Sequence, residues 1–327
     1  MAYTNTYTKE EQRALAVEKV KRSLAKVKSD VVTIFDAAVF PDYLDFVAKF
    51  HYYDVNNTVL IFGQNPDATF LSSFKAWQQF CLECYGDPKR PVFSTSQKEK
   101  GIGLLAPYIL KKTIDGAPRE RQAISYFDYH VVFAFDKAQT NNIPLPFLPW
   151  DLAGNEADSR ALFQAFQGQP ELDIQFEGRE RSFQFAYTPP ASPGEKGLLV
   201  LNRLDAGNYY LLCSYVLKHY VAQQLKKRLK VSSEDEFQRT CECVTYVLAS
   251  YFGLPRDKNA FFFVKSWGRN DQARMLNILN RVQTLSHLLI EALEEELVFQ
   301  KSLDNVEDIF DDDEIFDIGE AYGLNQF

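Results

Sequence analysis

The segment from Phe50 to Trp77 reads FHYYDVNNTVLIFGQNPDATFLSSFKAW, and residues 98–108 read KEKGIGLLAPY. The first segment places amide side chains beside aromatic and aliphatic ones. Such a mixture is typical of a groove whose walls stack against a planar ligand and whose floor forms hydrogen bonds with it. These two segments are therefore the first candidates for a binding surface.

A third segment, VVFAFDKAQTNNIPLP at residues 131–146, follows them in the chain. In this order, NNTVLIFGQNPDATFLSSFKAW, EKGIGLLAPY and the third segment resemble the N-terminal single-stranded DNA-binding domain of the ArdC antirestriction family. That family is found on plasmids and other conjugative elements. The resemblance implies a DNA-binding first half and a protein of a mobile genetic element or phage.

Bases and phosphates need different side chains. Each unpaired base that stacks on an aromatic ring contributes about 1 to 3 kcal/mol of binding free energy, whichever base it is. Phosphates favour lysine, which displaces condensed counterions. Phe74 and Trp77 lie three residues apart on a predicted helix, so the same rings also fit a core, and both interpretations remain open. The candidate DNA-binding residues are Asn56, Asn57, Gln64, Phe74, Lys75, Trp77, Lys98, Lys100, Lys111 and Lys112.

Length and composition predict a folded protein of two domains. The chain has 327 residues, 46% of them hydrophobic, with 27 Phe and 17 Tyr, which is enough for two separate cores. Its apolar runs are shorter than a membrane-spanning helix needs, and residues 1–13 are polar, without the apolar core of a signal peptide. We therefore expect a cytoplasmic protein without membrane partners.

The five cysteines are an odd set, and a reducing cytosol makes disulfides unexpected. Cys81 and Cys84 have the CxxC spacing of half a zinc site, but no second CxxC or HxxxH follows nearby to complete four ligands. We expect ordinary thiols there and no cofactor.

The net charge of −8 is concentrated at the C-terminus. Residues 302–327 hold nine acidic residues and no basic ones, which leaves 35 acidic and 36 basic residues in the first 301. A neutral body still binds nucleic acid where its basic residues cluster. The acidic tail also carries aromatic residues, so it fits three interpretations: a disordered tail, a docking motif, or a segment that occupies the protein's own basic groove.

Helix signals recur through the first half. Thr8 and Glu11 form a capping-box pattern before a basic helix, whose cations either face solvent or touch phosphates. Pro41 opens a second helix that ends at Phe50, and Asp54 caps a third that ends at Phe62. Ser72 or Ser73 caps the helix of Phe74. Strands are expected at 102–108 and 131–135.

The second half is expected to be mostly helical. A short helix at 158–166, strands within 173–187, a linker at 188–197 and a strand at 198–201 precede the main helices. Asn208 to Leu229 is predicted as a long helix, Ser232 or Ser233 caps another that ends at Phe252, and residues 272–300 form a last amphipathic helix.

In the ArdC family the corresponding helices carry a zincin-like metallopeptidase site. An HExxH motif places two imidazoles on one helical face, with a glutamate to activate the metal-bound water. Here Tyr215 stands at the first histidine position, Val216 at the general base and His219 at the second histidine. Glu242 matches the third ligand.

Valine carries no proton, so we expect no catalytic residues and no bound zinc. His219 and Glu242 are then remnant ligand positions, and His219 is expected to be partly buried and hydrogen-bonded to Glu242 or Tyr215.

We therefore predict an α+β protein. Residues 1–150 form an ArdC-like single-stranded DNA-binding domain with helices and a small sheet, residues 151–300 a mostly helical, inactive zincin-like domain, and residues 301–327 a flexible acidic tail. The preferred function is protection of DNA from host defence. An inhibitor that binds a host defence or replication protein directly, with the tail as nucleic-acid mimic, is the alternative, and an active peptidase with rearranged ligands is the third.

Overall fold

The structure is a computed structural model. It describes residues 8–309 with gaps at 88, 94–99, 114–122, 145–151, 153–154, 179–181, 193–194 and 231–232; the side chains of residue 9, 108–113, 123–127 and 301–309 are not described. The fold is α+β, as predicted, with two three-stranded sheets among the described residues.

The chain divides into two compact units, which are described separately below. The first unit consists of residues 1–150 and 230–287, and the second of residues 151–229 and 288–327. The division into domains at residues 150 and 300 that the sequence suggests remains a prediction.

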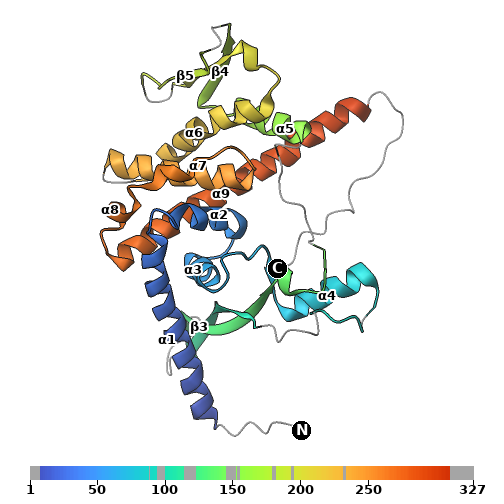
Figure 1. The fold of residues 1–327 in the computed structure, drawn as a ribbon, viewed down its shortest axis with the longest axis vertical. Coiled ribbons are helices and arrows are strands. Elements are labelled where there is room, and N and C mark those ends of the chain that lie inside the picture. Colours follow the sequence, from blue (N-terminus) through green and yellow to red (C-terminus); the bar gives the residue numbers. More distant parts are fainter. Residues whose placement is uncertain are drawn as a thin grey trace. The chain divides into compact units, whose positions relative to one another are not determined.

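Local capping explains where the first helices begin (Figure 1). Thr8 and Glu11 form the predicted capping box at the start of the first helix. Asp54 accepts hydrogen bonds from two backbone N–H groups of the third helix, and Ser73 accepts one from the fourth. The helices are α1 (Lys9–Ile34), α2 (Phe40–Phe50), α3 (Val55–Gln64) and α4 (Phe74–Tyr85).

The sheet of the first unit has the strand order β1-β3-β2, formed by β1 (Leu71–Ser72), β3 (Ala123–Asp136) and β2 (Ile102–Thr113). All pairs are antiparallel, and Gly103 lies opposite Phe133. Because side chains alternate along a strand, every second residue faces the core. Ile102, Leu104 and Ala134 form that core face and pack with α2 and α3 through Phe46, Phe50, Ile61 and their neighbours.

Later helices complete the first unit. An ionic cluster joins α2 to the chain after α7 (Glu234–Tyr251): Asp45 accepts hydrogen bonds from Arg256 at 2.7 Å and from Ser250 at 2.8 Å, and Lys258 lies 3.1 Å from its other oxygen. These donors hold the pKa of Asp45 below its usual value despite burial, which raises it. The remaining elements are η2 (Lys137–Gln139), η4 (Lys258–Phe261), α8 (Val264–Gly268) and the first part of α9 (Gln272–Ile309).

The second unit places a small sheet against helices. Its strand order is β4-β6-β5, with β4 parallel and β5 antiparallel to β6. Phe166 packs on Tyr220 with ring centroids 5.1 Å apart, which joins the two main helices of the unit. The elements are α5 (Glu156–Gln167), β4 (Leu172–Glu177), β5 (Phe185–Thr188), β6 (Gly197–Asn202), η3 (Arg203–Asp205), α6 (Tyr209–Arg228) and the last part of α9.

The predicted final helix is longer than the sequence suggests. It was expected to end at Gln300, but α9 continues to Ile309. The rest of the predicted tail, 310–327, lies outside the described residues. Among the described helices, none is long and apolar enough to cross a membrane.

Candidate nucleic-acid interface

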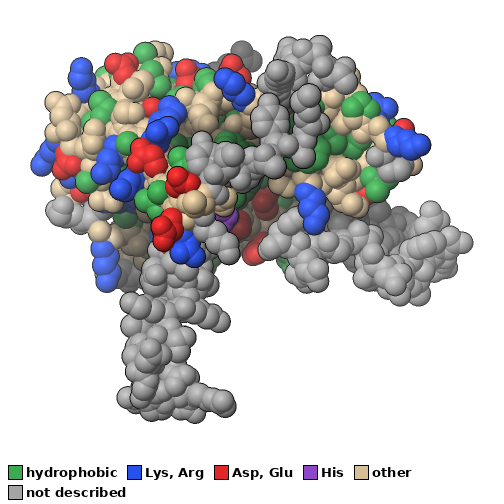
Figure 2. Space-filling view, turned by 90° about the horizontal axis from the view of Figure 1, so that it is seen from below, with side chains coloured by type: hydrophobic (Ala, Val, Ile, Leu, Met, Phe, Trp, Pro, Cys, Tyr) green, Lys and Arg blue, Asp and Glu red, His purple; other side chains and the backbone are tan. Residues whose placement is uncertain are grey.

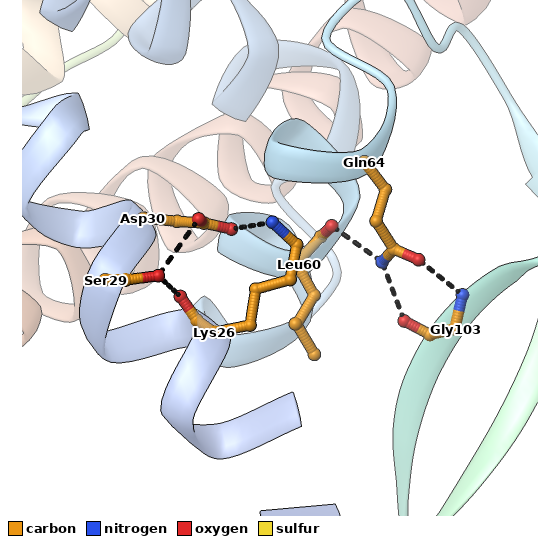
Figure 3. A network of polar contacts seen from close by, with 6 residues as sticks. All are labelled: Lys26, Ser29, Asp30, Leu60, Gln64 and Gly103. Carbon is orange, nitrogen blue, oxygen red and sulfur yellow. Dashed lines mark hydrogen bonds and ion pairs between the residues drawn. The ribbon is translucent and has the colours of Figure 1, made fainter. Parts of the chain in front are cut away.

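The two amides of α3 bind the free edge of the first sheet. Asn57 Nδ2 donates to the Leu105 carbonyl at 2.8 Å, and the Leu105 N–H donates to Asn57 Oδ1 at 2.7 Å. Two turns later, Gln64 makes the same pair of bonds with Gly103, each at 3.0 Å (Figure 3). Both side chains thus satisfy the backbone of edge strand β2, which would otherwise lack partners on that side.

Asn56, the residue before Asn57 in the first turn of α3, is half-buried. Its backbone N–H donates to the Asp54 carboxylate at 3.0 Å. Of the three predicted DNA-binding residues on α3, Asn57 and Gln64 bind the backbone of β2, and the side chain of Asn56 does not share that role.

A close approach between α1 and α3 positions these amides. A side chain at Gly63 would collide with the carboxylate of Asp30, which pairs with Lys26 at 2.7 Å (Figure 3). Glycine at 63 therefore permits α1 to lie directly on α3.

A buried carboxylate holds the other end of the sheet. Asp136 is completely buried, and its oxygens accept backbone N–H groups of Thr69 at 2.7 Å, Phe70 at 3.1 Å and Ala138 at 2.8 Å. These bonds join β1, β3 and η2 and account for the aspartate that follows the strand in the third sequence motif. Asp136 is a structural residue rather than part of a binding surface.

Trp77 belongs to the core beneath this end of the sheet. It is completely buried, and its Nε1 donates to the Phe135 carbonyl at 2.8 Å. It forms a cluster with Cys81, Val92 and Ile143. Of the two interpretations that the sequence leaves open, packing describes Trp77, and we do not place it in the interface.

Phe74, by contrast, begins a row of rings at the surface. Its ring lies 5.5 Å from that of Phe93, which lies 4.7 Å from that of Phe135. Phe133 and Tyr129 continue on the same face of β3, because they alternate with the core residues. Phe74 is 47% exposed and Phe133 54%. We call Phe74, Phe93, Phe135, Phe133 and Tyr129 the ring row.

One of the predicted lysines, Lys75, directly follows a residue of the ring row, Phe74. Lys100 precedes Gly101, whose backbone lies beside Phe133, and both lysines are exposed. Lys98 and the side chains of Lys111 and Lys112 lie outside the described residues, although Lys111 and Lys112 belong to β2. On the face shown in Figure 2, the described basic side chains are interspersed with acidic and apolar ones. Among the described residues of that face, charge of one sign does not dominate.

Four residues of the ring row, namely Phe93, Phe133, Phe135 and Tyr129, were missing from the sequence prediction. The alternation in VVFAFD, where Phe133 and Phe135 share one strand face, contains the signal. Gly101 and Gly103 point to the same face, because their positions alternate with Ile102. The sequence predicts a strand at 131–135 but does not show which of its two faces meets the core and which meets solvent.

The peptidase-like positions of α6 lie in an aromatic cluster of the second unit. Val216, which the sequence comparison aligns with the general base, is completely buried. His219 stacks on Tyr187 of β5 with ring centroids 4.3 Å apart, and Phe185 packs against both His219 and Tyr215. Burial, followed by the charge of Lys218, lowers the pKa of His219 to about 4. His219 is thus partly buried, as expected, but β5 supplies its ring partners.

Glu242 is half-buried on α7 in the first unit. Among the described residues, no group of three or more His, Cys, Asp and Glu side chains is arranged to hold a metal ion. Cys81, Cys213, Cys241 and Cys243 are buried cysteines that form no disulfide, and Cys84 is an exposed one.

The fold and site describe an α+β protein whose first unit presents an aromatic sheet face. Two solved structures are similar to it, both of the antirestriction ArdC protein from plasmid R388. The metal-free structure is 16% identical with a TM-score of 0.43, and the Mn(II)-bound structure is 17% identical with a TM-score of 0.41. Each match covers 75% of this chain and 85% of the other. The resemblance drawn from the sequence is to the same family.

No family model and no curated protein matches the sequence.

Proposed function

We propose that the first unit binds single-stranded DNA, without strong sequence preference, across the ring row. The observation that carries this proposal is a series of partly exposed aromatic rings on one face of β3 and at the start of α4, supported from below by the Trp77 cluster. Unpaired bases stack on such rings, whereas bases in a duplex keep their faces covered.

The distribution of charge favours stacking as the main source of affinity. Lys75 and Lys100 supply cations near the ring row, and Asp136 is sequestered by backbone N–H groups. Each lysine that contacts a phosphate of a single strand contributes about 0.7 to the slope of log K against log salt. With few lysines at the ring row, the affinity for single-stranded DNA should depend only modestly on salt concentration.

The biological role that we propose is protection of a mobile element's DNA from host defence. This role rests on the resemblance of the three sequence segments to the ArdC family, together with the ring row as a binding surface. In the same proposal the second unit lacks peptidase activity, because buried Val216 replaces the glutamate that would activate water.

Fluorescence anisotropy with labelled oligonucleotides tests the binding proposal. We expect saturable binding of a single strand at low salt and weaker binding of a duplex of the same length. Equal affinity for both, or no affinity for the single strand, would overturn it. The alternative, direct inhibition of a host defence protein by the acidic tail, predicts binding to neither oligonucleotide.

A further inference from the structure

The turn between α8 and α9 holds two consecutive residues in the left-handed backbone region. Arg269, the C-cap of α8, has a φ of 53°, and Asn270 has a φ of 54°. Both are exposed. Glycine adopts this conformation most easily and asparagine tolerates it, whereas arginine does not favour it. Arginine at 269 is thus costly for the backbone, which points to a role for its side chain.

The rest of the turn is fixed without Arg269. A Cβ at Gly268 would lie 2.7 Å from Phe35 Cδ1, so Gly268 is required for packing. On the other side, the Asp271 carboxylate accepts two N–H groups from the first turn of α9, at 2.9 Å and 3.1 Å. These contacts impose the left-handed turn whatever residue stands at 269, and glycine would meet that demand with less strain.

Arg269 belongs to a group of arginines around one carboxylate. Arg281 donates to Glu236 at 2.6 Å, and this hydrogen bond, more than the charges of Arg281, Arg274 and Arg269, holds the pKa of Glu236 below its usual value. One carboxylate thus faces three guanidinium groups. Arg274 Nε donates to the Trp267 carbonyl at 2.8 Å, whereas the Arg269 guanidinium makes no hydrogen bond or ion pair with other described residues.

An exposed ring borders these arginines. Phe262 is 83% exposed, and its ring centroid lies 6.1 Å from that of Phe263. The guanidinium of Arg239 lies over Phe263 at 5.0 Å, and the Trp267 ring packs against Phe263 at 5.8 Å. We call Arg239, Phe262, Arg269 and Arg274 the arginine surface.

We propose that the arginine surface is a second contact for the single strand bound at the ring row, with a backbone phosphate held by Arg269 and Arg274 and a base stacked on Phe262. Guanidinium groups pair with phosphate oxygens through two parallel hydrogen bonds, and an exposed ring stacks on an unpaired base. Both surfaces belong to the first unit. This inference rests on the proposed function and extends the bound strand beyond the ring row.

Arg269→Gly tests the inference, because it removes the guanidinium group and relieves the left-handed backbone. Its thermal midpoint should not fall below that of the wild type. Affinity for an oligodeoxythymidylate of about 40 nucleotides, several times the length that one binding groove covers, should fall several-fold. The slope of log K against log salt should become shallower by about 0.7, the value for one lost phosphate contact.

Two neighbouring substitutions are matched controls. Asn270→Gly relieves the same kind of backbone strain but keeps Arg269, so affinity and salt slope should equal those of the wild type. Lys265→Gln removes an exposed cation from α8 and should also bind like the wild type. Phe262→Ala, in contrast, should lower the affinity for the long strand without changing the salt slope, since it removes a stacked base and no phosphate contact.

A short oligodeoxythymidylate, of about 8 nucleotides, separates the two surfaces because it covers one binding groove only. Its affinity should be the same for the wild type and Arg269→Gly. An equal loss with both lengths, or wild-type affinity and salt slope of Arg269→Gly for the long strand, would overturn the second contact and leave the proposed function standing. If the wild type binds neither strand at low salt, the proposed function itself is overturned.

Discussion

Helix α3 and strand β3 of the first unit use amides and rings in opposite ways. α3 turns Asn57 and Gln64 onto the backbone of β2, whereas β3 exposes Phe133 and Tyr129 to solvent. Polar side chains here cover a free strand edge, and aromatic side chains form the reachable surface. The difference teaches that polarity alone does not identify a binding residue, because a buried backbone group also needs a hydrogen-bond partner.

The largest effect on stability is expected at Trp77, which is buried beneath the ring row, in contrast to the exposed rings of the row itself. Trp77→Ala should lower the free energy of unfolding by about 3 to 5 kcal/mol, because it leaves a cavity and frees the Phe135 carbonyl. Urea denaturation measures this loss. Phe74→Ala, at the exposed start of the same helix, is the control and should cost less than about 1 kcal/mol.

A stable Trp77→Ala protein that has lost its affinity for single strands would contradict this assignment. Trp77 would then contact the ligand directly.

The amides of α3 should affect stability and not recognition. Asn57→Ala leaves the N–H and carbonyl of buried Leu105 without their partner, so we expect a loss of about 2 to 4 kcal/mol. Faster hydrogen exchange of the Leu105 amide would locate the loss. Asn56→Ala, at the neighbouring half-buried position, should have little effect.

DNA affinity of folded Asn57→Ala should match that of the wild type. A selective loss of affinity at unchanged stability would move the binding surface to α3.

Lowering the pH should reduce the free energy of unfolding of the first unit, which contains both α3 and β3. His51 Nδ1 lies 3.0 Å from His287 Nδ1, and burial, then the neighbouring imidazole, lowers the pKa of His51 to about 4. The unfolded chain binds this proton near pH 6.5, so the neutral ring stabilises the fold above that pH. This contribution is lost as the pH falls toward 4, with an upper bound of about 3 kcal/mol.

Denaturation at pH 7 and pH 5 measures the loss. His51→Gln should reduce the pH dependence, and His130→Gln, at an exposed position of β3, should leave it unchanged. An equal pH dependence in wild type and His51→Gln would exclude this histidine as the cause.

The smallest effects are expected at the lysines. Lys75→Gln and Lys100→Gln should each reduce the slope of log K against log salt by about 0.7 for a single strand. Lys265→Gln, an exposed lysine elsewhere in the first unit, is the control. Salt titration of the anisotropy signal provides the measurement. Unchanged slopes in both variants would place the phosphates away from the ring row.

Local sequence signals predicted most of the helices. Caps such as Thr8, Asp54 and Ser73 satisfy backbone groups within the same helical turn, so their effect is visible without tertiary information. The predicted end at Gln300, before the expected acidic tail, falls short of the end of α9 at Ile309. Residues 301–309 contain neither glycine nor proline, so nothing local stops the helix before Ile309.

The site was harder to predict for a tertiary reason. Whether Asn57 faces a ligand or a strand depends on β2, which lies 48 residues further along the chain. The exposure of Phe133 depends on which face of β3 receives α2 and α3. Alternation identifies the two faces of a strand but does not say which of them is covered.

Ultraviolet cross-linking of oligodeoxythymidylate to the intact protein, followed by mass spectrometry, compares the two regions directly. The account predicts cross-links at Phe133, Phe93 or Phe74 and none within α3. Cross-links confined to α3, or to α6 of the second unit, would contradict it.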